Sequence, residues 1–433
     1  MVASAKTCPY FSLICRWIGF LRMWNAVVPI VLLDRFGATG VVAYEIALAA
    51  CAVIALPVAT LWTEQLSRAQ VMRWACSIIV LSGISRLAIA GAALGLTFWM
   101  LNDMIAVAAF ASMQPLLGVY PAETVEKVRV LAAFRLKRVV VNLGRICGPL
   151  LAGTALLLYT WQYALGCLAV LGCCALPILL RLPTPPSPDR RQSPVPISAK
   201  TILHRTFAGF ALKIRLSAER CFTLWDMLLG VATAGVVPVL IPQLVRQARL
   251  PESQAGWLIA AFVIGSIAGV AILHPMLAGA FGRRPGYVAG WAALGVSLAM
   301  ATVADTTVWP GASLMSAGAI GACLSMNGID RRVIALPSRV RVRVAGATLL
   351  TTRLAGMLSF ALYGISYASH TMEGRWWLYG GLVSIAVLSS CLASEPWRLL
   401  GVKDAEGSVE KFYSDRYPAA FDTAEPVQRD AAE

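Results

Sequence analysis

The chain has 433 residues, of which 58% are apolar and only 14% are charged, and its mean hydropathy is +0.71. Soluble globular proteins are nearer half apolar and a quarter charged, so this composition excludes a soluble protein and predicts a membrane protein. The formal net charge of +15 would favour nucleic acid in a soluble protein, but here the basic residues cluster in loops between apolar segments. The eleven cysteines are scattered through apolar runs, which indicates small apolar side chains rather than disulfides, metal ligands or a cofactor site.

Apolar runs of about 20 residues, the length that crosses a bilayer as a helix, recur along the chain. The first run is preceded only by Lys6 and has no small-residue cleavage site, so we expect it to remain as a helix rather than to be removed as a signal peptide. The sequence thus predicts an all-α polytopic membrane protein with twelve transmembrane helices. They are expected at 11–33, 40–62, 74–93, 97–118, 138–159, 161–181, 221–244, 254–277, 287–304, 310–328, 345–368 and 375–394.

The basic residues are distributed unevenly between alternate loops. Most lie at 63–73, 119–138, 181–220, 278–286 and 329–344, whereas the opposite loops hold only Arg35, Arg246, Arg249 and Arg375. Cytoplasmic loops carry the excess of lysine and arginine. We therefore expect a multi-pass protein of the inner (plasma) membrane with both termini in the cytoplasm.

The chain also repeats itself. The triplet Val-Val-Pro at 27–29 recurs at 236–238, and Arg-x-x-Gly at 145–148 recurs at 353–356. These matches predict two six-helix halves, 1–181 and 219–394, related as parallel repeats. The connection at 182–218 is rich in proline and then cationic and amphipathic, which predicts an extended linker followed by a helix on the membrane surface; a plain solvated linker is the alternative. The polar segment 395–433 is expected to be a disordered tail.

Small residues recur at four-residue spacing in the predicted fifth span, where Gly144, Gly148 and Ala152 share one helix face. Such a face allows a neighbouring helix to approach closely, and Pro149 removes one backbone donor and bends the helix there. The residues Gly144, Gly148, Pro149 and Gly153 also fit the pattern Gly-x-x-x-Gly-Pro-x-x-x-Gly. Ordinary helix packing with a proline kink is one interpretation of this motif.

The other interpretation comes from a resemblance. The pattern is similar to the fifth-helix signature of exporters of the major facilitator superfamily, and the block 115–153 resembles the branch that contains enterobactin exporters and related secretion effectors. A second motif, formed by Leu277, Gly282, Arg283 and Arg284, is similar to the superfamily's cytoplasmic loop signature. It departs from that signature at Pro275, Gly279 and Ala280. The resemblance implies the major facilitator fold, a monomer and a secondary exporter.

Polar groups inside a membrane are costly and are expected at functional sites. We predict that the substrate cavity is lined by Arg22, Asn25, Arg86, Asn142, Arg145 and Arg353. The candidates for proton coupling are Asp103, the first choice, followed by Asp226 and Glu45. Each has a plainer alternative: Asp103 paired with Arg86 for structural reasons, Asp226 near the membrane interface, and Glu45 solvated at the outer end of the second span. Asn102, His274 and Asn327 are further polar positions, the last two of them near helix ends.

No nucleophile–base pair, metal-ligand spacing or phosphate-binding glycine loop is present in the sequence, so we expect a protein that is not an enzyme and is not driven by ATP. The predicted function is proton-coupled alternating access that exports a small anionic metabolite, such as a siderophore, because arginines outnumber carboxylates among the candidates. The expected partners are this anion, protons and the lipid bilayer, and no nucleic acid. Drug or multidrug efflux, or a non-transporting receptor that kept the fold, are the alternatives.

Overall fold

A computed structural model gives the architecture of the chain. It describes residues 8–124 and 210–401 with short gaps at 66–67, 212, 252, 281–282, 303–307, 336–337, 369–378 and 389–393. It also describes a few positions between 148 and 173 and between 411 and 415. The regular structure in these parts is helical, and they contain no strand.

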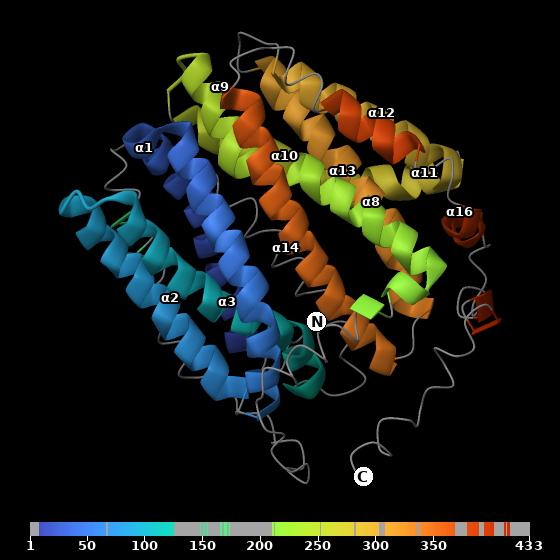
Figure 1. Ribbon diagram of the computed structural model, residues 1–433, viewed down its shortest axis with the longest axis horizontal. Coiled ribbons are helices and arrows are strands. Elements are labelled where there is room, and N and C mark those ends of the chain that lie inside the picture. Colours follow the sequence, from blue (N-terminus) through green and yellow to red (C-terminus); the bar gives the residue numbers. More distant parts are fainter. Residues whose placement is uncertain are drawn as a thin grey trace.

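The first half begins with helix α1 (Cys8–Gln65), which joins the first two predicted spans. α1 breaks at Gly37, whose φ of 70° lies in the left-handed region that glycine adopts without a steric cost. We refer to the parts before and after Gly37 as the first and second limbs of α1. Helices α2 (Arg68–Gly91) and α3 (Leu96–Thr124) follow and match the third and fourth predicted spans. Figure 1 shows these three helices grouped on one side of the molecule.

The second half contains the helices that match predicted spans seven to eleven. Span seven is interrupted by a π-helical turn, η2, and span eight by another, η3. The elements are α8 (Ser217–Thr233), η2 (Val236–Leu240), α9 (Ile241–Gln247), α10 (Ser253–Ala268), η3 (Gly269–Leu273), α11 (His274–Ala280), α12 (Arg283–Ala301), α13 (Val308–Ala335) and α14 (Ser338–Ala368).

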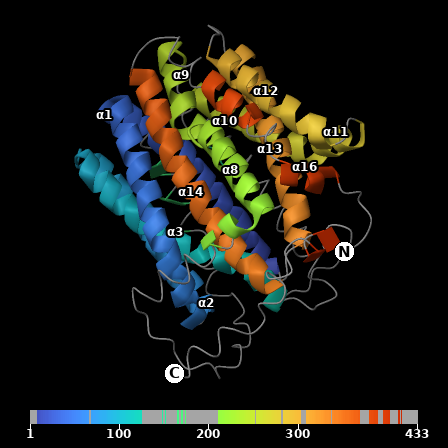
Figure 2. The ribbon, with the colours of Figure 1, turned by 45° about the vertical axis from the view of Figure 1, so that its right-hand side comes forward.

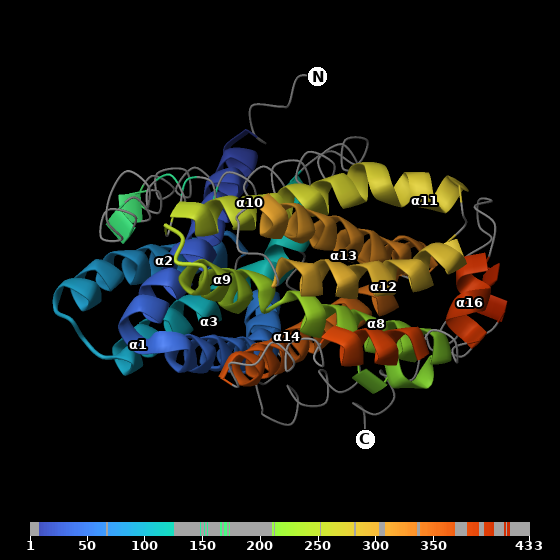
Figure 3. The same cartoon turned by 90° about the horizontal axis from the view of Figure 1, so that it is seen from above.

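The two halves meet along α14, which lies beside α1 of the first half and α8 of the second. Figure 2 shows α14 between these two helices, and the view from above in Figure 3 shows α2 and α11 at opposite ends of the molecule. η2, α9 and α10 also contact α1. At this end of the bundle the Arg246 guanidinium donates a 3.4 Å hydrogen bond to the Leu33 carbonyl. The loops of this end, 34–39 and 245–253, are those that the charge distribution predicts to be extracytoplasmic.

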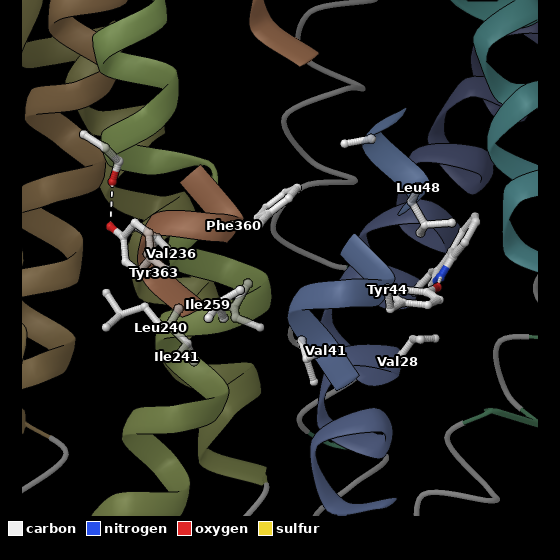
Figure 4. Packing of buried hydrophobic residues seen from close by; sticks show 14 of the residues in the cluster. Val28, Val41, Tyr44, Leu48, Val236, Leu240, Ile241, Ile259, Phe360 and Tyr363 are labelled. Atoms are coloured by element: carbon white, nitrogen blue, oxygen red, sulfur yellow. Dashed lines mark hydrogen bonds between the residues drawn. The ribbon is translucent and has the colours of Figure 1, made fainter. Parts of the chain in front are cut away.

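Seven helical segments in the described part of the chain are long and apolar enough to cross a membrane. Many large apolar side chains point outward from them, including Leu101 and Ile105 on α3 and Ile264 on α10. A band of exposed apolar side chains is expected where helices face lipid rather than water. The buried side chains, by contrast, form a core that extends across both halves; Figure 4 shows part of it, from Val28 and Leu48 on α1 to Leu240 and Ile259.

Predicted spans five and six lie almost entirely outside the described residues, and of span twelve the structure describes the apolar helix Tyr379–Leu388.

The prediction of a disordered tail from residue 395 is wrong at its start. Ser394–Gly401 forms helix α16, whose Leu399 and Leu400 are buried where it packs on α8, α12 and α13. A polar average over the whole tail concealed this short amphipathic helix. Lys213, one of the basic residues of the cationic amphipathic part of the linker, is buried rather than solvated.

Candidate functional site

A buried ion pair joins α2 to α3. The Arg86 Nε atom donates to Asp103 Oδ1 at 2.6 Å, and both side chains are 0% exposed. A charge in a membrane interior is tolerated only when it is paired or wet. The pairing of Arg86 with Asp103 was the structural alternative that the sequence left open.

Asp103 accepts further hydrogen bonds from three neighbours. The Tyr44 hydroxyl donates to Oδ2 from the second limb of α1, and the Asn102 amide donates to Oδ1 at 2.7 Å. The Ser82 hydroxyl lies 3.5 Å from Oδ1. A carboxylate offers about four acceptor positions, and with Arg86 the three neighbours place four donors around Asp103.

The arginine of this pair is held from the other side by an aromatic ring. The Arg86 guanidinium carbon lies 3.9 Å from the ring centre of Trp24, on the first limb of α1, a cation–π geometry. Trp24 in turn donates a long 3.4 Å hydrogen bond from its indole nitrogen to the Tyr44 oxygen. These contacts connect both limbs of α1 with α2 and α3. We call the six residues Trp24, Tyr44, Ser82, Arg86, Asn102 and Asp103 the Arg86 cluster.

Sequence reasoning found Arg86, Asn102 and Asp103 but missed Trp24, Tyr44 and Ser82. Aromatic and hydroxyl side chains are common in apolar helices, so their presence alone does not mark a site. The sequence feature that could have identified Tyr44 is its position beside the carboxylate of Glu45, within an apolar run that contains few other polar residues.

Glu45 follows Tyr44 on the second limb of α1 but does not join this network. Its side chain is partly buried, and so is that of Arg353 on α14. The two charges are near enough to interact electrostatically, and Asp103 also acts on Glu45. Among the residues that the structure describes, neither Glu45 nor Arg353 forms a hydrogen bond or an ion pair. Two complementary charges therefore lie on opposite sides of the boundary between the halves without direct contact.

The interruption of predicted span seven is stabilised by hydroxyl groups of α14. The Ser359 hydroxyl accepts a 2.8 Å hydrogen bond from the Gly235 amide and donates one of 2.7 Å to the Val231 carbonyl. It thus replaces the direct bond that an unbroken helix would form between Gly235 and Val231. The Tyr363 hydroxyl donates to the Ala232 carbonyl at 2.7 Å, the dashed line in Figure 4. A side chain inserted into the helix ladder is a recognised cause of a kink.

The remaining predicted residues are dispersed. Asp226 is partly buried on α8, and His274 is buried at the start of α11. Gly148 is buried in a helical position. Arg22, Asn25 and Asn327 lie on helices, but their side chains are outside the described residues, as is that of Arg283. Asn142, Gly144, Arg145, Pro149, Gly153 and Gly282 lie outside the described residues altogether.

The loop motif has an observed contact of its own. Leu277 is partly buried on α11, and Arg284 is exposed at the start of α12. The Arg284 Nε atom donates to the Trp397 carbonyl of α16 at 2.7 Å. The motif arginine therefore anchors the helix that follows predicted span twelve.

Comparison with known proteins identifies structures that are similar to this helical arrangement. No protein-family model and no curated protein sequence matches the chain. Solved structures do match: the nucleoside transporter NupG is 14% identical, with a TM-score of 0.70, and the match covers 90% of this chain and 100% of that one. A D-xylose-proton symporter is 13% identical with a TM-score of 0.67, covering 90% and 98% of the two chains.

A third similar structure is a bacterial homolog of the human lysosomal transporter Spinster in an inward-facing and occupied conformation. It is 14% identical with a TM-score of 0.65, and the match covers 93% of this chain and 100% of that one. At these identities the likeness establishes the fold. The chain is an all-α polytopic membrane protein with the major facilitator fold, which confirms that part of the sequence prediction.

Proposed function

We propose that the protein is a secondary active transporter that exports a small anionic metabolite by proton-coupled alternating access. The fold supports transport, because the similar structures named above are of transporters. The observation that carries the proposal is the position of Arg353. This arginine is partly buried on the helix where the halves meet, and it has no hydrogen-bond partner among the described residues.

An arginine in that position suits an anion. Its guanidinium stays charged at ordinary pH and offers a planar set of donors that fits a carboxylate. Arg86 is already paired with Asp103, so that Arg353 is the described arginine best placed to hold cargo. Arg22 and Arg145 remain further candidates. A polycarboxylate, of the kind found in citrate-type siderophores, supplies the negative charge that such a set requires.

The interrupted helix supports the conformational part of the proposal. Broken helices at membrane depth occur where backbone groups are satisfied by neighbours and where transporters rearrange. The kink of span seven faces α14, the helix that also contacts α1. A rotation of the halves would therefore act on a helix in which one backbone hydrogen bond is already replaced by the Ser359 hydroxyl.

Transport in vesicles tests the proposal. The purified chain is reconstituted, and the flux of polycarboxylate and citrate-type siderophore probes is measured with and without a pH gradient, together with proton flux reported by a pH-sensitive dye. We expect anion flux that depends on the gradient, and its loss in Arg353→Ala with Arg246→Ala as the matched arginine control. Gly148→Leu is expected to reduce flux more than folded yield.

Other results would contradict the proposal. Flux of cationic or neutral drugs without anion flux would identify a multidrug transporter. Binding of a probe with no flux under any gradient would identify a receptor.

A further inference from the structure

Two neighbouring residues of α1 have opposite surroundings. Tyr44 is 1% exposed and donates to Asp103, within the Arg86 cluster. Glu45 is partly buried and forms no hydrogen bond with a described residue. Successive helical residues are about 100° apart around the axis, so that the two side chains leave α1 in different directions. Tyr44 faces the first half. The direction of Glu45 is given by the contacts of the residues that share its face of α1.

The face of α1 that carries Glu45 packs on α14. Val42 lies one turn before Glu45 and contacts Gly364 of α14. A Cβ atom added to Gly364 would be only 2.7 Å from the Val42 side chain. Leu56, three turns after Glu45, belongs to one small buried cluster with Leu350 of α14 and Ala111 of α3. Residues spaced three and four apart share one helix face. The positions 42, 45, 49, 52 and 56 therefore form a single stripe along the boundary between the halves, and Glu45 is its only ionisable member.

The facing stripe on α14 has the same form. Leu350 and Gly364 mark its ends, and the positions 350, 353, 357, 360 and 364 follow the same three-and-four spacing. Arg353 is its only ionisable member. The two helices are antiparallel, because the early residue Val42 meets the late residue Gly364. Between the two charges, α1 presents the small buried residues Ala49 and Ala52.

We infer that Glu45 is the proton-accepting group of this transporter and that Arg353 is its electrostatic partner across the two halves. The inference rests on the proposed function and assigns the coupling to a different residue from the one that the sequence favoured. Asp103 is unsuited to this task, because it is fully buried and holds Arg86 in place. A proton on Asp103 would leave the guanidinium charged and unpaired in the membrane.

The sign of the coupling follows from the charges that act on Glu45. These charges are Asp103 and Arg353, together with the phenol of Tyr44 on the same helix. Arg246, on α9, also lies at the boundary between the halves, but its guanidinium donates to the Leu33 carbonyl. Ionised Glu45 attracts Arg353 and competes with an anionic cargo for it. Protonated Glu45 leaves Arg353 available, so that the proton and the anion bind together rather than in turn. A polyanion accompanied by one proton still carries net negative charge outward, which an inside-negative potential drives.

Binding of a defined anion tests this coupling. The probe is benzene-1,3,5-tricarboxylate, whose charge is nearly constant between about pH 6 and 8 because carboxyl groups titrate mainly below that range. The full chain in nanodiscs is expected to bind it about fivefold or more tightly at pH 6 than at pH 8, a coupling of typical size. Glu45→Gln should bind it equally well at both pH values. Arg353→Gln should lose binding at both, with Arg246→Gln as the matched control.

Infrared titration of the same samples separates this inference from the proposed function, because it needs no cargo. A protonated carboxyl band that titrates in the wild type should vanish in Glu45→Gln, persist in the charge-balanced double variant Asp103→Asn/Arg86→Gln and move in Arg353→Gln. If the infrared results are as expected but the probe does not bind, the proposed cargo class is rejected and the Glu45–Arg353 pair stands. A band that survives Glu45→Gln, or pH-dependent binding that survives it, would overturn the inference. Elution as a single folded species is required of every variant.

Discussion

The two halves solve the same packing problem in different ways. In the first half, α1, α2 and α3 are joined by the Arg86 cluster, in which a buried ion pair, a phenol and an indole connect four helical segments. In the second half, α10 and α13 touch backbone to backbone. A Cβ atom added to Gly265 would lie 1.8 Å from the Met315 carbonyl oxygen, and one added to Gly318 would lie 2.0 Å from that of Phe262.

The difference follows from what a membrane offers to a helix pair. Lipid is as apolar as the helix surface, so association depends on close packing and on polar bonds rather than on the hydrophobic effect. The Arg86 cluster is directional and fixes the rotation of each helix, since a displaced donor leaves a buried charge. The glycine contact between α10 and α13 depends on shape alone. We therefore expect the first half to fail when charge is unbalanced and the second half to fail when volume is added.

The largest effect is expected from Asp103→Asn. The change leaves Arg86 charged and unpaired, and breaking a buried pair in this way costs about 3–5 kcal/mol in the free energy of unfolding. The double variant Asp103→Asn/Arg86→Gln should recover most of that loss, because both charges are removed. Thermal unfolding of the purified variants in detergent measures both effects. If the double variant is as unstable as the sum of the single ones, charge balance is not what the cluster provides.

A smaller loss is expected from Gly318→Ala. The added methyl group meets the backbone of α10, and overpacking of this kind costs typically about 1–3 kcal/mol. Gly311→Ala on the same helix is the matched control, since the nearest atom to its added Cβ would be Leu258 Cδ2 at 3.9 Å, an ordinary contact. The same unfolding assay compares the two. Equal stability of both variants would show that α10 and α13 separate easily and that the glycine contact is not restrictive.

The smallest effects concern the hydroxyl groups at the span-seven kink. Tyr363→Phe removes one hydrogen bond, worth about 1 kcal/mol, whereas Ser359→Ala removes both an acceptor and a donor and should cost more. Backbone hydrogen exchange at Gly235 provides a local measurement, and it should accelerate in Ser359→Ala but little in Tyr363→Phe. Unchanged exchange in Ser359→Ala would mean that the kink persists without its inserted hydroxyl.

The sequence by itself determined the elements that depend on local composition. Apolar length predicted the described spans, since a helix must be apolar over the bilayer thickness, but α13 and α14 extend up to seven residues beyond the predicted bounds. The break near 34–39 was also predicted, although only the structure identifies Gly37 as its pivot. Arg86 and Asp103 could be selected because ionisable groups in apolar runs are rare. The helix α16 escaped prediction because it is short and lies within a polar segment.

Only the tertiary structure decided which polar groups meet. Tyr44 and Glu45 are adjacent in sequence, yet one is bonded within the first half and the other lies on the boundary with α14. That outcome depends on the rotation of the second limb of α1 about its axis, which is set by Asp103 on α3, Arg86 on α2 and Trp24 on the first limb. In the same way, the partner of Gly235 is a serine 124 residues away. No local pattern encodes such pairings, because they arise from the packing of helices that are distant in the chain.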